Sequence, residues 1–387
     1  MAAFYMNKNK YIVLRLCIFL KGLFPSVLSM FFFRKPNRVT FCSEFNTEFN
    51  HNSKWLFFYF LENVDNYEIR FVVNDHHQRE ELTRCYGQYF ITNTKFSDIF
   101  YILSSSIWFT SSLETPIGGF FHSFRRKVFH LGHGIPIKSI GLSEKKRRNF
   151  KKVYYFFVRT NFSYFISTSS IFDSVWKGFL NVPESKVIRG GQPRNDILFV
   201  NNSHNNYFSD NKKNILYAPT WRPYSETLIF PFTDFSADDL EVFLKELNAV
   251  IYLRLHPNFE ENIPDYISNI DGVIVLKKEH VSDINELLGE VDLLITDYSS
   301  IYADFLLLNR PIMFIPYDFD VYEQHIGFSV DYKMLTPGPK PTSFEEFKLE
   351  IITLLSCSDY YSEERKNICN IFNSINKEHS KSIYDLL

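Results

Sequence analysis

The sequence predicts an α/β protein with two doubly wound domains and a basic amphipathic helix in front of them. Strand-like and helix-like segments alternate from about residue 38 onward, which is typical of parallel sheets with helical crossovers. A polar, asparagine-rich stretch at residues 201–213 interrupts the alternation. A chain of 387 residues is also longer than one ordinary hydrophobic core requires. We therefore predict an N-terminal segment at residues 1–36, a first domain at 37–200, a linker at 201–213 and a second domain at 214–387.

The composition is that of a folded globular protein, with 45% hydrophobic and 22% charged residues. The net charge of −2 argues against nucleic acid as a partner. Five scattered cysteines without a CxxC pair indicate reduced thiols in a cytosolic protein, with neither a disulfide framework nor a zinc site.

The N-terminal segment is basic and aromatic. Residues 1–43 hold seven Lys or Arg and no Asp or Glu, and Arg15, Lys21 and Pro25 interrupt the apolar run Tyr11–Phe33. Since a membrane-spanning helix needs about 20 apolar residues, we expect a segment that lies on the anionic inner face of a membrane. The alternative is an ordinary first helix packed on its domain.

Short apolar runs bounded by turn residues predict the strands of both sheets. In the first half they are Arg38–Ser43, Ile69–Asn74, Ile107–Ser111, Lys127–Leu131, Tyr164–Ser167 and Lys186–Arg189. In the second half they are Asn214–Ala218, Val250–Leu255, Gly272–Leu276, Leu293–Thr296 and Pro311–Pro316. The helices expected between them are Lys54–Leu61, Phe96–Leu103, Ile171–Leu180, Ala237–Leu247, Asp283–Leu288, Ser300–Leu308 and Phe344–Leu355.

Ligands of doubly wound sheets bind at the carboxyl ends of the strands, so the segments that follow strands are the candidate sites, in a cleft between the halves. His133 stands between Gly132 and Gly134 directly after a strand, where the backbone can approach a ligand. A histidine is the usual general base for a hydroxyl, and a loop histidine bonded to backbone is the alternative. Arg194, after another strand, is a candidate phosphate contact, unless it pairs with Asp196.

The second half offers similar groups. Arg222 follows its first strand, and strand alternation puts Arg254 and His256 on one face. A strand then runs into Thr296-Asp297-Tyr298-Ser299-Ser300 at the start of a helix, where free N–H groups and the helix dipole favour a phosphate. Helix capping by a serine is the alternative for this last segment.

These groups together suit the transfer of a phosphate-bearing group, in which positioning and charge stabilisation do most of the catalysis. The sequence contains no Walker lysine motif, GxSxG or HExxH, which disfavours P-loop NTPases, hydrolases and zincins. It shows no DxD-type acidic pair where a divalent ion would be expected, so we expect a site without metal and an enzyme without a cofactor.

The chain resembles the CDP-glycerol glycerophosphotransferase family, the teichoic-acid type primases and polymerases, over roughly residues 38–375. The resemblance is carried, in family order, by His133-Gly134-Ile135-Pro136-Ile137-Lys138, Gln192-Pro193-Arg194-Asn195-Asp196, Tyr217-Ala218-Pro219-Thr220-Trp221-Arg222, Arg254-Leu255-His256-Pro257, Thr296-Asp297-Tyr298-Ser299-Ser300 through Asp304-Phe305, and Tyr317-Asp318.

The resemblance implies a GT-B-like fold of two Rossmann-like domains, with a CDP-alditol donor held mainly by the second. It implies His133 as the general base and His256 as the group that stabilises the pyrophosphate. The other expected contacts are Thr296, Ser299, Ser300, Arg222 and Arg254 on the donor phosphates, Asp304 on the ribose, and Lys138 and Arg194 on the acceptor or a phosphate.

The implied reaction moves an alditol phosphate to a hydroxyl of a lipid- or polymer-linked acceptor and releases CMP, in the synthesis of a teichoic-acid-like or capsular surface polymer. The enzyme would act at the cytoplasmic face of the cell membrane as a peripheral protein. Glycerol phosphate is the expected group and ribitol phosphate the close alternative. A GT-B glycosyltransferase that uses a nucleotide sugar and an inactive membrane-bound scaffold are the competing hypotheses.

Overall fold

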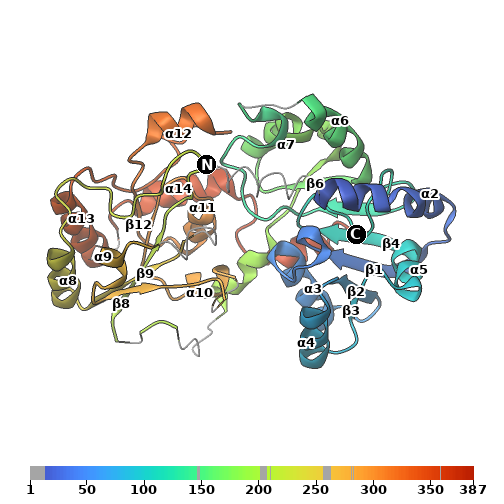
Figure 1. The fold of residues 1–387 in the computed structure, drawn as a ribbon, viewed down its shortest axis with the longest axis horizontal. Helices are drawn as coiled ribbons and strands as arrows, with labels where there is room; N and C mark the ends of the chain where they lie inside the picture. The colour runs from blue at the N-terminus through green and yellow to red at the C-terminus, as the bar shows by residue number, and fades with distance from the viewer. Residues whose placement is uncertain are drawn as a thin grey trace. The chain divides into compact units, whose positions relative to one another are not determined.

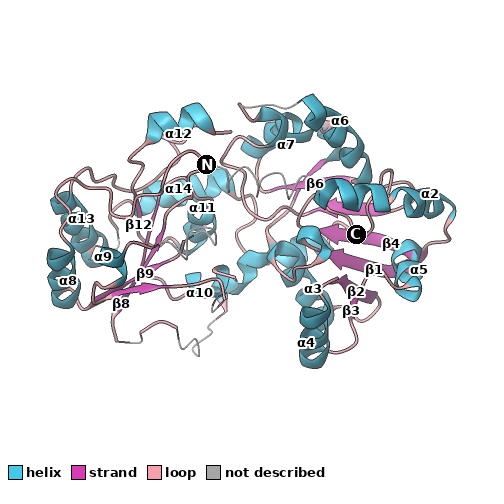
Figure 2. Ribbon diagram, viewed as in Figure 1, coloured by secondary structure: helices cyan, strands magenta, loops and turns pink. Residues whose placement is uncertain are grey.

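The polar stretch near residue 200 adjoins the boundary between two structural units. The computed structural model describes residues 14–145, 149–200, 207–209, 211–255, 263–279, 281, 283–357 and 359–387. Unit 1 comprises Met1–His133, Ile140–Asp196 and Ser374–Leu387, and unit 2 comprises Gly134–Ser139 and Ile197–Asn373. Figure 1 traces the chain through its helices and strands, and Figure 2 distinguishes the two kinds of element.

Unit 1 is built on a seven-stranded parallel sheet with the order β3-β2-β1-β4-β5-β6-β7. Its strands are β1 (Lys35–Cys42), β2 (Glu68–Val72), β3 (Phe90–Ile91), β4 (Ser105–Thr110), β5 (Lys127–His130), β6 (Tyr164–Ser167) and β7 (Val187–Arg189). Six of them lie where the sequence predicts strands. The seventh, β3, has two residues, too few to give an alternation signal.

Helices cover both faces of this sheet, as expected for a doubly wound fold. They are α2 (Leu23–Phe31), α3 (His51–Asn63), α4 (His76–Tyr86), α5 (Phe96–Ser104), α6 (Asn149–Val158), α7 (Asp173–Leu180) and α15 (His379–Tyr384). Neighbouring strand residues alternate between two cores: Phe41 and Phe71 pack with α3 and α15, whereas Cys42 and Val72 pack with α5, α6 and α7. Burial on both faces explains why the later residues of β1, β2 and β4 are mostly apolar.

Unit 2 has a five-stranded parallel sheet with the order β10-β9-β8-β11-β12. Its strands are β8 (Lys213–Ala218), β9 (Ala249–Leu253), β10 (Val273–Val275), β11 (Leu293–Thr296) and β12 (Ile312–Phe314). Its helices are α8 (Ala237–Glu246), α9 (Asp265–Ser268), α10 (Asn285–Leu288), α11 (Ile301–Phe305), α12 (Phe319–His325), α13 (Phe344–Ser356) and α14 (Ser362–Phe372). One face of the sheet packs on α8 and α13, and Tyr302 of α11 contacts Phe314 and Phe372 on the other face.

The last residues of the chain belong to unit 1, which differs from the expected single domain at 214–387. Helix α15 begins at the carboxylate of Asp196, which accepts hydrogen bonds from the backbone N–H groups of His379 (2.7 Å) and Ser380 (2.8 Å). The Gly191 N–H donates to Ser382 Oγ at 2.9 Å, and Ile383 is fully buried in the core. The Asp196 carboxylate therefore holds the start of α15.

Residues 14–31 are helical apart from a turn at Gly22 and are packed into unit 1 along one side. Arg15 Nε donates to Glu114 Oε1 at 2.8 Å, and the Glu114 side chain is almost completely buried. A Cβ atom added to Gly22 would lie 1.8 Å from the carbonyl carbon of Gly118, so only glycine permits this approach. Among the described residues, this is the one helical stretch long and apolar enough to cross a membrane by length and composition. Residues 1–13 lie outside the described part of the chain.

Candidate active site

His133 lies on a glycine-flanked loop at the carboxyl end of β5. Gly132 and Gly134 have φ values of 70° and 148°, a backbone region that favours glycine, and they turn an exposed His133 out of the sheet edge. His133 Nδ1 lies 3.1 Å from the carbonyl oxygen of Ser111. Because a carbonyl only accepts hydrogen bonds, Nδ1 carries the hydrogen, so the neutral imidazole has its lone pair on Nε2. The backbone contact that was the alternative to a catalytic role thus sets the tautomer that a base requires.

Two buried side chains fix this loop from below. Asn52 Nδ2 donates to the carbonyl oxygens of Leu131 (3.2 Å) and Gly132 (2.9 Å). Arg194 Nη1 donates to the carbonyl oxygen of His133 at 2.6 Å, and Arg194 is only 7% exposed. The guanidinium of Arg194 thus supports the backbone of His133, and its expected phosphate contact stays a prediction. Asn52 was not anticipated, because nothing local in the sequence separates it from any other helix-start asparagine.

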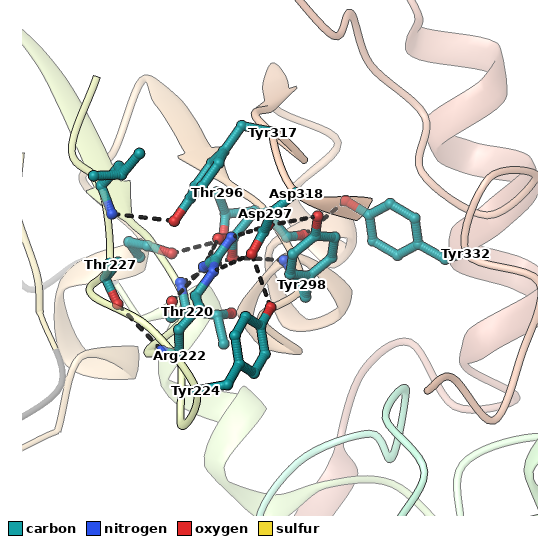
Figure 3. A network of polar contacts seen from close by, with 12 residues as sticks. Thr220, Arg222, Tyr224, Thr227, Thr296, Asp297, Tyr298, Tyr317, Asp318 and Tyr332 are labelled. Carbon is teal, nitrogen blue, oxygen red and sulfur yellow. Dashed lines mark hydrogen bonds and ion pairs between the residues drawn. The ribbon is translucent and has the colours of Figure 1, made fainter. Parts of the chain in front are cut away.

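The most extensive polar network of unit 2 is centred on Arg222 (Figure 3). Its guanidinium forms ion pairs with Asp297 and with Asp318, at 2.7 Å from Nη2 to Asp318 Oδ1 and 3.1 Å from Nε to Asp318 Oδ2. The Arg222 side chain has no exposed surface. Both edges of the guanidinium are thus occupied by protein carboxylates in this structure, and the expected contact between Arg222 and the donor phosphates stays a prediction.

Tyrosines complete this network. Asp318 accepts hydrogen bonds from the hydroxyls of Tyr224 (2.8 Å) and Tyr298 (3.1 Å), and the Tyr332 hydroxyl donates to the Asp297 carbonyl at 2.9 Å. Burial opposes the charge of Asp318, but the hydrogen bonds from Arg222 and the tyrosines lower the pKa of this carboxyl below its ordinary value. The aspartates after β11 and β12 were noted only as parts of motifs; their pairing with an arginine after β8 was missed.

Lys138 approaches this network although it lies only five residues after His133. The segment Gly134–Ser139 joins unit 2, where Lys138 forms an antiparallel bridge with Phe328 and its Nζ lies 5.9 Å from the ring centre of Tyr322. Burial lowers the pKa of Lys138 to about 8, with Asp297 opposing and Arg222 adding to the shift. The predicted site residue Lys138 is therefore a half-buried cation close to the charges of Asp297 and Arg222.

The hydroxyl side chains at the end of β11 and directly after it differ in burial. Thr296 is fully buried and donates to the Ala218 carbonyl at 2.7 Å, which ties β11 to β8. Its expected phosphate contact stays a prediction. Ser299 Oγ accepts a long hydrogen bond of 3.4 Å from the Ile301 N–H. Ser300 occupies the N-cap position of α11 without a side-chain cap, and both serines are half-buried. Capping accounts for Ser299 alone.

The remaining predicted residues have different positions. Arg254 follows β9, is half-buried, and donates from Nη1 to the Leu276 carbonyl at 3.0 Å. Asp304 lies in α11 with no exposed surface, and its expected contact with the ribose stays a prediction. His256 lies outside the described residues. Within the described ranges, no group of three or more His, Cys, Asp or Glu side chains is arranged to hold a metal ion, and all five cysteines are free.

These features define a GT-B-like transferase. Each unit has a parallel sheet between two layers of helices. Unit 1 carries a histidine suited to act as a base, and unit 2 carries a charged network lined by tyrosines. The chain belongs to the CDP-Glycerol:Poly(glycerophosphate) glycerophosphotransferase family, whose model matches residues 25–387. Its expected membership of this family and its GT-B-like fold are thereby confirmed.

Several characterised proteins are similar to this chain. A teichoic acid poly(glycerol phosphate) polymerase of Bacillus spizizenii is 26% identical, covering 79% of this chain and 80% of the polymerase. A teichoic acid glycerol-phosphate transferase of Staphylococcus aureus is 27% identical, covering 78% of this chain and 80% of the transferase. In fold, the chain resembles the wall teichoic acid polymerase TagF, with a TM-score of 0.74 at 23% identity, covering 91% of this chain and 88% of TagF.

Proposed function

We propose that this enzyme transfers glycerol phosphate from CDP-glycerol to a hydroxyl of a lipid- or polymer-linked acceptor and releases CMP, in the synthesis of a teichoic-acid-like or capsular surface polymer. The observation that carries the proposal is the fixed tautomer of His133, whose Nδ1 is held by the Ser111 carbonyl. Family membership supports the donor class. The same donor is consistent with relatives that are glycerol-phosphate polymerases and transferases.

In the proposed reaction, His133 Nε2 takes the proton of the acceptor hydroxyl while its oxygen attacks the β-phosphorus of the donor. The bond between that phosphorus and the bridging oxygen breaks, and CMP leaves with the oxygen. Charge on the phosphates would be stabilised by the half-buried Ser299, Ser300 and Arg254 and by the predicted His256, with Lys138 as a further cation. This assignment needs no metal ion or cofactor.

The released nucleotide tests the proposal. The protein is incubated with an acceptor and, in separate reactions, with CDP-glycerol, CDP-ribitol and UDP-sugars, and the products are separated by chromatography. We expect CMP from CDP-glycerol. CMP from CDP-ribitol alone would instead favour ribitol phosphate, since a teichoic acid poly(ribitol-phosphate) polymerase of Bacillus spizizenii is 26% identical over 87% of this chain and 54% of the polymerase. Release of UDP would support the competing glycosyltransferase hypothesis, and release of no nucleotide the inactive scaffold.

Donor affinity should fall between pH 7 and pH 9 if Lys138 contacts a donor phosphate. Because the pKa of Lys138 is lowered to about 8, its ammonium is charged below that pH and neutral above it. Loss of one charged hydrogen bond should raise the Kd of CDP-glycerol about tenfold. Calorimetric titration of Lys138→Arg should show a flatter pH profile, because arginine keeps its charge. An unchanged profile in Lys138→Arg would contradict the assignment, and Lys366→Arg serves as the surface control.

We further propose that the N-terminal helix attaches the enzyme peripherally to the anionic cytoplasmic face of the membrane. Large apolar side chains of this helix remain exposed in the described structure, with Phe24 at 73% and Phe31 at 82% exposure. Lys21 is also exposed and suits an anionic surface.

Replacing Phe24 and Phe31 with glutamate should move the protein from sedimented anionic vesicles to the supernatant. This test is sharper than deletion of the segment, because deletion would remove Arg15 from the buried Glu114. The matched control replaces Met334 and Leu349, which are 77% and 62% exposed in unit 2, with glutamate. Equal sedimentation of both variants with the parent would refute the membrane contact.

A further inference from the structure

Unit 1 places two further functional groups beside His133 that the proposed reaction does not use. The rings of His51 and His133 lie 5.3 Å apart, centre to centre, and are tilted by 36°. Glu44 is near enough to His133 for the imidazole to influence the carboxylate. Glu44 begins the turn that follows β1, and His51 begins α3, so both lie at the carboxyl edge of the sheet, where β5 also delivers His133.

The backbone that carries these two groups adopts a rarely populated conformation. Phe45, Asn46 and His51 have φ values of 52°, 60° and 58°, in the left-handed region that non-glycine residues seldom adopt. The surrounding structure holds this conformation, since Asn46 Nδ2 donates to the Thr115 carbonyl at 2.9 Å and the Asn46 carbonyl accepts from the Asn74 N–H at 2.6 Å. Such strain concentrates at functional sites.

The first turn of α3 is also fixed to the residues that orient His133. The Ser53 N–H donates to Ser111 Oγ at 2.7 Å, and the carbonyl of the same Ser111 accepts from His133 Nδ1. Asn52, between His51 and Ser53, binds the His133 loop directly. Hydrogen bonds therefore hold His51 and His133 in fixed positions relative to each other, and a ligand bound to one imidazole can contact the other.

The charges around Glu44 and His51 indicate which chemical group of an acceptor can bind there. Burial raises the pKa of Glu44, and the neighbouring Glu114 and Glu48 add to the shift, whereas His133 and Arg15 oppose it. Glu114 is paired with Arg15, whereas Glu44 and Glu48 add two carboxylates at this edge of the sheet, which disfavours a phosphate. Carboxylates and imidazoles are, however, good hydrogen-bond partners for neutral hydroxyl groups, because both accept from an O–H donor.

We propose that Glu44 and His51 form a polyol subsite, which binds neighbouring hydroxyls at the acceptor terminus and directs one of them toward His133. The ligand class is a neutral vicinal diol, as found at the end of a glycerol phosphate unit. The inference rests on the proposed function and specifies the acceptor side of the same reaction, with both residues as substrate-binding groups.

The test compares two synthetic probes, decyl glycerol phosphate and the same molecule with both hydroxyls methylated. Calorimetry should give a Kd about tenfold lower for the diol than for its dimethyl ether with the parent protein. Glu44→Gln and His51→Ala should bind both probes equally. His51→Asn, which tolerates the left-handed backbone and keeps a polar tip, should retain part of the preference.

The control variant removes a second His and Glu pair of unit 1 that lies elsewhere. His76 and Glu80 of α4 are 3.4 Å apart with side chains 73% and 66% exposed, and H76A/E80Q should keep the full preference for the diol. The acceptor KM should rise about tenfold in Glu44→Gln and stay at the parent value in H76A/E80Q.

Retention of the diol preference in both Glu44→Gln and His51→Ala would overturn the subsite. So would an equal loss of water-dependent and acceptor-dependent CMP release, which would indicate an effect on His133 itself. Failure of the proposed function is a separate result, because the parent would then release no CMP while the probe affinities could still be measured.

Discussion

Replacement of His133 with alanine should lower kcat for CMP release by about 10²- to 10⁴-fold, the usual contribution of a positioned general base. The carbonyl of Ser111 holds Nδ1–H and leaves Nε2 as the acceptor of a proton, so removal of the imidazole removes that acceptor outright. The side chain is exposed, and its loss leaves no buried cavity. The free energy of unfolding should therefore change little.

Steady-state release of CMP from CDP-glycerol, with and without acceptor, measures this effect. The Kd of the donor should stay near the parent value, since the donor contacts are assigned to unit 2. His77→Ala, an exposed histidine of α4, is the matched control and should retain parent activity. A His133→Ala protein that turned over donor and acceptor at the parent rate would exclude His133 as the base.

Replacement of Arg222 with methionine should lower the free energy of unfolding by about 3–5 kcal/mol, the cost of leaving buried charges unpaired. Asp297 and Asp318 both depend on this guanidinium, whose side chain has no exposed surface. Although burial disfavours its charge, the two carboxylates raise the pKa of Arg222 above its ordinary value, so the arginine is firmly charged. Methionine supplies similar bulk, and the main loss is electrostatic.

Urea unfolding of three variants separates charge from packing. The triple variant R222M/D297N/D318N removes both stranded carboxylates and should recover part of the lost stability. Lys366→Met breaks an exposed pair with Glu363, whose side chains are 52% and 77% exposed, and should change stability by less than about 0.5 kcal/mol. If Arg222→Met unfolded within 1 kcal/mol of the parent, the network would not be the electrostatic core of unit 2.

The parallel sheets were predictable because their signal is local. Both faces of each strand are buried, so β1, β5 and β8 read as short apolar runs that end in turn residues. Gly132 and Gly134 indicated a backbone that can approach a ligand, and both adopt positive φ values beside His133. Both the strands and the conformation of the His133 loop are determined mainly by residues adjacent in the sequence, so a local pattern was enough to predict them.

The partners of polar side chains were not predictable in the same way. Arg222 and Asp297 lie 75 residues apart, and only the order of strands in the sheet brings them together. A motif also does not reveal which of its side chains face the protein: Thr296 and Asp304 stand in matching strings but are fully buried. Arg194 has the residue type of a phosphate ligand and acts as a support for a loop.

The position of residues 374–387 in unit 1 affects the order in which the protein can fold during its synthesis. Domains usually fold as they leave the ribosome, beginning with the one nearest the N-terminus. Here α15 fills part of the core beside α3. The Asp196 carboxylate gains its hydrogen bonds only when His379 and Ser380 have been synthesised. The ribosome thus begins unit 1 before most of unit 2, but it synthesises α15 only after unit 2. Unit 1 can complete its core and its catalytic edge only after that.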